Sequence, residues 1–137
     1  GVKYFNTFAR NPASCAIGTA VLDVVQGDGL QERALEVGNY LIAELTALRE
    51  LHPMIGDVRG HGLYMGVELV IDPVSRTPAT EQAKEICEIL KENGVFNYPT
   101  GKYDNVLKIK PPMVFGKEHA DIFVSTLGTA LTKIESR

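Results

Sequence analysis

The chain has 137 residues, of which 45% are apolar and 23% are charged. This balance fits one globular domain with its own core and argues against a disordered chain. The formal net charge of -3 provides no basic surface of the kind that attracts nucleic acids, so a nucleic-acid partner is not expected. No apolar run reaches the length of a membrane span, so no membrane partner is expected either.

The cysteines and histidines point to no disulfide and no metal site. The two cysteines, Cys15 and Cys87, lie far apart, and each falls within an apolar helical pattern. This placement predicts two buried free thiols in a reducing, intracellular compartment, without resolving cytoplasm from mitochondrion. The three histidines, His52, His61 and His119, are scattered along the chain, so metal binding is not expected.

The chain opens with an aromatic stretch around Thr7 that leads into a helix start at Asn11 and Pro12. Asparagine at the N-cap satisfies a free backbone amide, and proline at the first helical position loses no hydrogen bond. Apolar residues then recur at helical spacing until Gly27 ends the run. An amphipathic helix is therefore predicted over residues 11–25.

Three more helices are predicted further along the chain. An apolar stripe between Asp28 and Pro53 indicates the longest of them. Another runs from Thr80 and closes at Gly94, and glycine is the usual residue just after a helix end. The last follows Gly116 and has roughly five turns by the rise of an α-helix.

Three strands are predicted between these helices. Residues 62–71 alternate between two faces with the period of a strand. Residues 95–98 and 105–109 are two shorter strands separated by Pro99-Thr100-Gly101. A proline pair ends the last strand, because neither nitrogen can donate to a strand ladder.

A tight turn is predicted before the first strand, at Arg59, Gly60 and Gly62. These three residues are expected to have a structural role. Helices and strands alternate along the chain without separating into blocks. The expected fold class is therefore α/β (α+β two-layer), with a small, mainly antiparallel sheet covered by helices.

Three motifs in this chain occur in the same order in class III pyridoxal-phosphate aminotransferases. Residues 7–12 (Thr-Phe-Ala-Arg-Asn-Pro) resemble the family's Thr-aromatic-Gly-Gly-Asn-Pro segment. Residues 58–63 (Val-Arg-Gly-His-Gly-Leu) resemble Val-Arg-Gly-x-Gly-Leu, and residues 108–113 (Lys-Ile-Lys-Pro-Pro-Met) resemble Arg-x-x-Pro-Pro-Leu. By this resemblance, residues 11–137 are similar to the C-terminal small domain of a fold type I enzyme, and residues 1–10 to the interdomain, active-site segment before it.

The resemblance also implies what lies outside this chain. The large cofactor-binding domain and its Schiff-base lysine are expected upstream, so no catalytic residue is expected among these 137 residues. Because the chain begins inside a motif, it is expected to be a piece of a longer protein and to be inactive alone.

By the same resemblance, Thr7 donates a hydrogen bond to the phosphate of pyridoxal 5'-phosphate bound in the partner subunit. This role implies a homodimer whose cofactor site is shared between subunits. From the residues alone, an ordinary turn threonine is the alternative. The two glycines of the family motif are Ala9 and Arg10 here, and glycine allows backbone geometry that other residues avoid.

Lys108 stands where the family motif has an arginine that grips the substrate carboxylate. A lysine is a compact point charge, whereas arginine offers a planar fork matched to a carboxylate. The replacement therefore favours a substrate whose anionic end is a phosphate or one that has no α-carboxylate. The alternative for Lys108 is a solvated lysine on a strand.

The sequences of residues 108–113 and of residues 76–80 (Arg-Thr-Pro-Ala-Thr) resemble those of one branch of the family, the phospho-lyases that act on ethanolamine phosphate or 5-phosphohydroxylysine. This implies elimination of phosphate from a phosphorylated primary amine to give aldehyde, ammonia and phosphate. Within the family, an omega-amino acid or alanine-glyoxylate aminotransferase is the alternative. Outside it, a free-standing α/β interaction or regulatory domain without a cofactor remains open.

Overall fold

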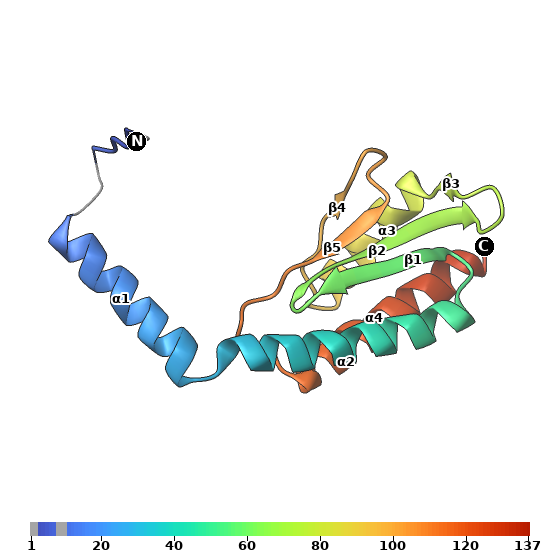
Figure 1. Ribbon diagram of the computed structural model, residues 1–137. Helices are drawn as coiled ribbons and strands as arrows, with labels where there is room; N and C mark the ends of the chain where they lie inside the picture. The colour runs from blue at the N-terminus through green and yellow to red at the C-terminus, as the bar shows by residue number, and fades with distance from the viewer. Residues whose placement is uncertain (1–2, 8–10) are drawn as a thin grey trace.

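The computed structural model describes residues 3–7 and 11–137 (Figure 1). The described residues form a two-layer α/β structure of helices packed on a small antiparallel sheet, which confirms the expected fold class. In chain order the elements are α1 (Pro12–Gly27), α2 (Leu30–Leu51), β1 (Ile55–His61), β2 (Tyr64–Asp72), β3 (Thr77–Pro78), α3 (Thr80–Glu92), β4 (Pro99–Thr100), β5 (Val106–Ile109) and α4 (Lys117–Glu135).

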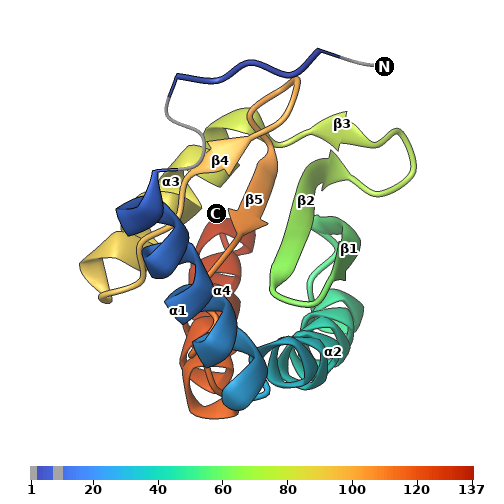
Figure 2. The ribbon, with the colours of Figure 1, turned by 60° about the vertical axis from the view of Figure 1, so that its left-hand side comes forward.

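The main sheet has the strand order β1-β2-β5-β4, and every neighbouring pair is antiparallel (Figure 2). The short β3 pairs with the end of β2. Along β2, the side chains of Met65, Val67 and Leu69 are buried, while the alternate positions Gly66 and Glu68 are partly exposed. The sheet therefore has one face in the core and one open face, which is where charged side chains gather.

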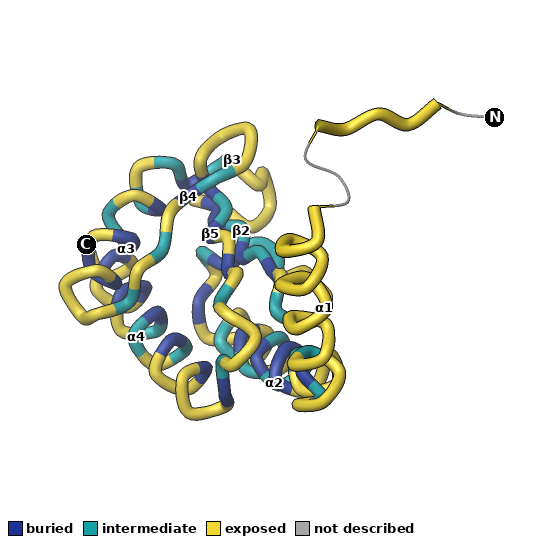
Figure 3. Tube along the Cα trace, turned by 90° about the vertical axis from the view of Figure 1, so that its left-hand side faces the viewer, coloured by how far each residue is buried: buried dark blue, intermediate teal, exposed yellow. Residues whose placement is uncertain are grey.

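The core lies between the inner sheet face and helices α2, α3 and α4 (Figure 3). All three helices present apolar stripes at helical spacing, as the sequence predicts. The residues buried at 0% exposure in these helices are Leu41, Leu45, Ala83, Ile86, Leu90, Ala120, Leu127, Ala130 and Leu131. Burying each large apolar side chain contributes about 1.5–3 kcal/mol relative to leaving it exposed.

Helix α1 differs from the other three helices because it has no buried residue. Its start is as predicted: the Asn11 side chain accepts hydrogen bonds from the amides of Ala13 and Ser14, at 2.9 and 3.4 Å. Its apolar side chains, among them Ile17 at 67% and Val21 at 56% exposure, face solvent. The helix extends away from the sheet, and among the described elements it contacts mainly α2 (Figure 1).

The structure corrects the prediction around the first strand. Arg59 and Gly60 lie within β1, a strand that the sequence pattern did not predict. The tight turn instead consists of Gly62 and Leu63, because His61 already pairs with Tyr64. Gly62 has a φ of 53°, a left-handed conformation that glycine adopts without strain.

A second correction concerns the strand predicted over residues 95–98. The structure places no strand there. Strand β4 begins directly after this segment, with Pro99 opposite Leu107 and Thr100 opposite Val106. Residue Asn97 still contacts the sheet, because its side-chain amide donates to the carbonyl of Lys108 at 3.3 Å. The strand predicted over 105–109 is confirmed as β5.

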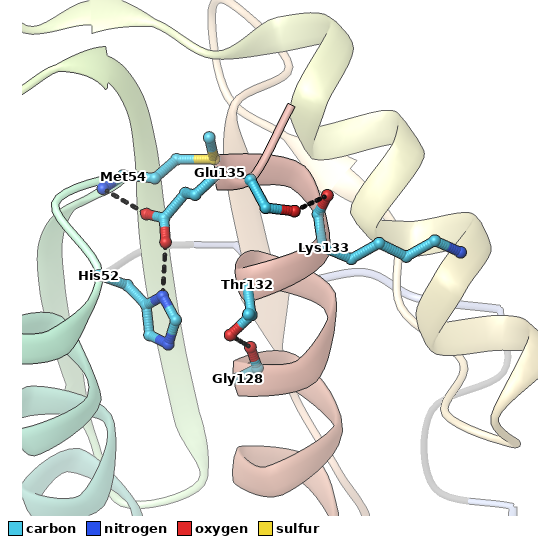
Figure 4. Close-up of polar contacts among 7 residues, drawn as sticks. His52, Met54, Gly128, Thr132, Lys133 and Glu135 are labelled. Carbon is cyan, nitrogen blue, oxygen red and sulfur yellow. Dashed lines mark hydrogen bonds and ion pairs between the residues drawn. The ribbon is translucent and has the colours of Figure 1, made fainter.

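A part-buried polar contact joins the C-terminal ends of α2 and α4 (Figure 4). Nδ1 of His52, which follows α2, lies 2.6 Å from the Glu135 carboxylate at the end of α4. The other carboxylate oxygen of Glu135 accepts from the amide of Met54 at 3.2 Å. Both oxygens are thus hydrogen-bonded, so the start of β1 is fastened to α4.

The prediction of two buried thiols is right for Cys87 and wrong for Cys15. Cys87 is buried in α3, whereas Cys15 is exposed because α1 has no covering partner among the described residues. Burial, together with the nearby charge of Glu88, raises the pKa of the Cys87 thiol to about 11. Only a thiolate reacts readily with alkylating reagents, so the two thiols should differ in reactivity.

We expect iodoacetamide at pH 8 to label Cys15 of the 137-residue chain much faster than Cys87, as read by peptide mapping. A sample unfolded in urea should label both sites at similar rates. Because burial raises the pKa of Cys87 from 9.0 to about 11, the pH has no effect on folding through this thiol well below pH 9, and the fold loses stability as the pH rises from about 9 towards 11. Equal labelling of both thiols in the folded chain would contradict the burial of Cys87.

Among the described residues, no helix is long and apolar enough to cross a membrane.

Candidate functional site

The candidate site lies on the open face of the sheet, where two cationic side chains flank a glycine. Arg59 on β1 is opposite Gly66 on β2, and Gly66 is opposite Lys108 on β5. The three residues therefore form one row across the sheet, with both cations on the same face. They line a hollow of about 510 Å³, completed by residues of the β1–β2 and β4–β5 hairpins: Gly60, Tyr64, Met65, Thr100, Gly101 and Val106.

Arg59 is held in place by two carboxylates on the same face. Its Nη1 donates to Asp57 and to Glu68, each at 2.7 Å. Asp57 and Glu68 face each other in the neighbouring row of the sheet. These hydrogen bonds, that to Asp57 first, raise the pKa of the Arg59 guanidinium, so the side chain stays charged and oriented.

Lys108 is exposed and forms no ion pair with any residue of the described ranges 3–7 and 11–137. Its neighbours in β5, Leu107 and Ile109, point into the core and fix the strand. A lysine on a firmly packed strand with an unpaired ammonium group can bind an anionic ligand. Lys108 is therefore accessible to a ligand, and its role in substrate binding stays a prediction.

Lys108 also borders a second, larger groove of about 730 Å³. This groove runs between the segment before β4, the proline pair after β5 and the start of α4, and its lining includes Phe96, Tyr98, Pro111, Phe115, His119 and Ile122. The side-chain oxygen of Asn97 is buried there without a hydrogen-bond partner in the described residues. No sequence pattern predicts this groove, because its lining comes from three separate segments.

Thr7 lies in the exposed segment before α1. Tyr4 and Phe5 beside it are 75% and 90% exposed, and within residues 3–7 and 11–137 no hydrogen bond to the Thr7 hydroxyl is present. The N-terminal segment and β5 lie apart in Figures 1 and 3. Thr7 lines neither of the two hollows that Lys108 borders. Ala9 and Arg10, which replace the two glycines of the family motif, lie outside the described residues.

These observations fit a partial contribution to pyridoxal phosphate binding. An exposed hydroxyl without an internal partner is free to donate to a phosphate on another chain. The described residues include no group of three or more His, Cys, Asp or Glu side chains that could hold a metal ion. Within the described residues, the candidate groups are therefore the Thr7 hydroxyl and the two cations Arg59 and Lys108 on a sheet face that also carries the carboxylates of Asp57 and Glu68.

Comparison with known proteins gives a family match along most of the chain. The model of the family "Aminotransferase class-III" matches residues 3–131. The Arabidopsis thaliana protein "Alanine--glyoxylate aminotransferase 2 homolog 2, mitochondrial" is 46% identical over 132 residues, covering 96% of this chain and 28% of that protein. The Drosophila melanogaster protein "Alanine--glyoxylate aminotransferase 2-like" is 44% identical, with 98% and 27% covered.

Two solved structures are similar along nearly the whole chain. A phospholyase from Arthrobacter in complex with phosphoethanolamine is 40% identical with a TM-score of 0.88, covering 94% of this chain and 31% of that one. An amine transaminase from an uncultivated Pseudomonas species, in its pyridoxal-phosphate-bound form, is 30% identical with a TM-score of 0.83, covering 96% and 30%.

This chain spans less than a third of the length of the relatives that it matches. The family match nevertheless extends over nearly all of the described residues, and the fold is shared with solved members. The chain therefore belongs to the class III aminotransferase family, the members of which depend on pyridoxal phosphate.

Proposed function

We propose that this chain is the C-terminal part of a pyridoxal-phosphate-dependent phospho-lyase that eliminates phosphate from a phosphorylated primary amine. Residues 11–137 would form the small domain, and residues 1–10 the segment that reaches the active site. The observation that carries the proposal is Lys108, an unpaired lysine on the open sheet face at the position of the family's arginine. The similarity to a phospholyase that binds phosphoethanolamine supports it.

Lys108 would bind the phosphate end of the substrate. Its ammonium group carries three donors on a flexible stem, which suits a rounded, doubly charged anion better than a planar carboxylate. The cofactor, when bound, supplies the electron sink for loss of the α-proton. Lys108 would stabilise the negative charge that grows on the departing phosphate, so its contribution increases as the C–O bond breaks.

Thr7 would act in the other subunit of a homodimer. The exposed N-terminal segment and α1 project from the domain, and their apolar side chains have no cover within the described residues. A second subunit placed against this segment would bury those side chains and bring the Thr7 hydroxyl to its cofactor phosphate. Cofactor binding and dimer formation would then favour each other.

An aminotransferase is the second candidate. The relatives from Arabidopsis and Drosophila, at 46% and 44% identity, carry the name alanine-glyoxylate aminotransferase. Family membership also favours an enzyme over a free-standing interaction domain. The lyase releases phosphate and ammonia, whereas the aminotransferase transfers the amino group to an acceptor. The reaction products therefore distinguish the two functions.

The test uses the full-length protein that contains this chain, loaded with pyridoxal phosphate. Ethanolamine phosphate is offered alone, and phosphate and ammonia are measured. In parallel, alanine with glyoxylate and ω-amino donors with pyruvate are followed for transferred amine. We expect phosphate and ammonia in equal amounts and little transfer. Efficient transfer without phosphate release would reject the lyase and leave the aminotransferase.

Replacing Thr7 by valine is expected to weaken cofactor binding by the full-length protein about tenfold. A hydrogen bond to a charged group contributes about 1.5–3 kcal/mol, and each 1.4 kcal/mol corresponds to a factor of ten. Thr7→Ser keeps the hydroxyl and serves as the matched control. The dissociation constant of pyridoxal phosphate, measured from the change in cofactor absorbance, checks the prediction; wild-type affinity in Thr7→Val would refute it.

A further inference from the structure

We infer that Arg59 is a second anion-binding residue and that Arg59 and Lys108 together form a two-cation cradle over Gly66 for the phosphate end of the substrate. This inference rests on the proposed function, in which Lys108 alone has that role. It adds a residue from the Val-Arg-Gly-His-Gly-Leu motif, for which the sequence predicted only a structural role in a turn.

The first argument is the register of the sheet. Arg59 and Lys108 are both paired with Gly66, one from each side. Since adjacent strands lie about 4.8 Å apart, the two Cα atoms are separated by roughly 10 Å, and the side chains rise from the same face. A phosphate group with a hydrogen bond on each side fits between two such long side chains, and both of them line the same hollow.

The second argument is the glycine between the cations. A Cβ atom added to Gly66 would lie 3.0 Å from Cγ1 of Val106, so even a methyl group would be crowded. Any larger side chain at this position would project from the open face into the space between Arg59 and Lys108. Glycine therefore keeps the floor of the hollow clear for a ligand.

The third argument is the set of donors that Arg59 has left. Both carboxylates, Asp57 and Glu68, are bound through the single atom Nη1. A guanidinium has five N–H donors, so Nε and Nη2 remain for a ligand. Because the carboxylates already hold the side chain, less conformational entropy is lost when an anion binds.

The number of oxygens favours phosphate as the ligand. Asp57 and Glu68, in the neighbouring row, together more than balance the charge of Arg59, so the uncompensated positive charge of this face is that of Lys108, which has no acidic partner among the described residues. A phosphate has three terminal oxygens that point in different directions, so one can face Lys108 while another faces Arg59. A carboxylate has two oxygens in one plane and is satisfied by one arginine fork.

The test measures binding of inorganic phosphate to the full-length holoenzyme, in which the cofactor occupies its own phosphate site. Calorimetric titration compares the wild type with Arg59→Gln, Lys108→Gln and Gly66→Ala. Arg49→Gln is the matched control, because Arg49 is an exposed arginine near the end of α2. We expect the dissociation constant to rise at least tenfold in the first three variants and to stay unchanged in the control.

A thermal unfolding curve of each variant shows whether it is folded, since Arg59→Gln leaves Asp57 and Glu68 without their shared partner. Arg59→Lys restores the charge and should recover part of the affinity in a folded background. Wild-type affinity in folded Arg59→Gln, or no measurable phosphate binding by the wild-type holoenzyme, would overturn the inference. If the wild type binds phosphate through both cations yet releases none from ethanolamine phosphate, the phosphate site of Arg59 and Lys108 is confirmed and the proposed lyase reaction is rejected.

Discussion

Replacing Lys108 by glutamine in the full-length protein is expected to lower kcat/KM for ethanolamine phosphate about 100-fold. Lys108 has no ion-pair partner among the described residues, so its charge is not already compensated within the chain. A charge-assisted hydrogen bond contributes about 1.5–3 kcal/mol, and the upper part of this range corresponds to two powers of ten in rate. Glutamine retains a hydrogen-bond donor, on a side chain one bond shorter, but has no charge, so the substitution removes the ammonium group and keeps a polar side chain.

Phosphate release under substrate-limiting conditions is the measurement. Lys110→Gln is the control, because Lys110 is also exposed but lies beyond the end of β5. The second variant is Lys108→Arg, which keeps the charge in a planar fork. This variant should retain more activity than Lys108→Gln and should bind carboxylate inhibitors more tightly than the wild type. Unchanged kcat/KM in Lys108→Gln would remove the residue from the site.

The helices could be predicted from the sequence because each has a local signal. Apolar residues at helical spacing marked α2, α3 and α4, and these stripes are the faces that the core buries. The capping side chain of Asn11 fixed the start of α1. Such signals depend on residues within a few positions of each other, so no knowledge of the rest of the chain was needed.

Strand β1 could not be predicted in the same way. The register shifts between Ile55 and Asp57, so the alternation of buried and exposed positions is interrupted at Gly56. Only the pairing with β2 makes residues 55–61 a strand. As a result the sequence predicts a turn at Arg59. Only the register of three strands shows that Arg59 and Lys108 lie in one row, on either side of Gly66.

The two predicted site residues came from motifs and not from periodicity. Lys108 and Thr7 were identified by their places in segments that resemble the family, and the structure shows that both are accessible. The apolar face of α1 shows what helical spacing does not predict. Helical spacing predicts that a face is apolar but not whether another element covers it. No residue of α1 is buried in the part of the chain that the structure describes, so the prediction of a buried Cys15 is wrong.

Replacing Gly38 by alanine is expected to destabilise the small domain by about 1–3 kcal/mol, the usual range for overpacking. Gly38 lies in the middle of α2, where the helix meets the β1–β2 hairpin. A Cβ atom at this position would lie 2.8 Å from Cα of Gly62 and even closer to its carbonyl group. These are backbone atoms in a turn with positive φ, so no side-chain rotation relieves the clash.

Helix propensity acts in the other direction, because alanine is favoured over glycine in a helix by about 0.5–1 kcal/mol. Gly18→Ala on α1 measures this gain alone, since nothing lies within 4 Å of a Cβ atom at Gly18. We therefore expect Gly18→Ala to leave the unfolding temperature of the full-length protein unchanged or slightly raised, and Gly38→Ala to lower it. Faster hydrogen exchange in β1 and β2 of Gly38→Ala would locate the damage at the hairpin. If both variants were equally stable, α2 and the β1–β2 hairpin would not be in close contact at Gly38 and Gly62.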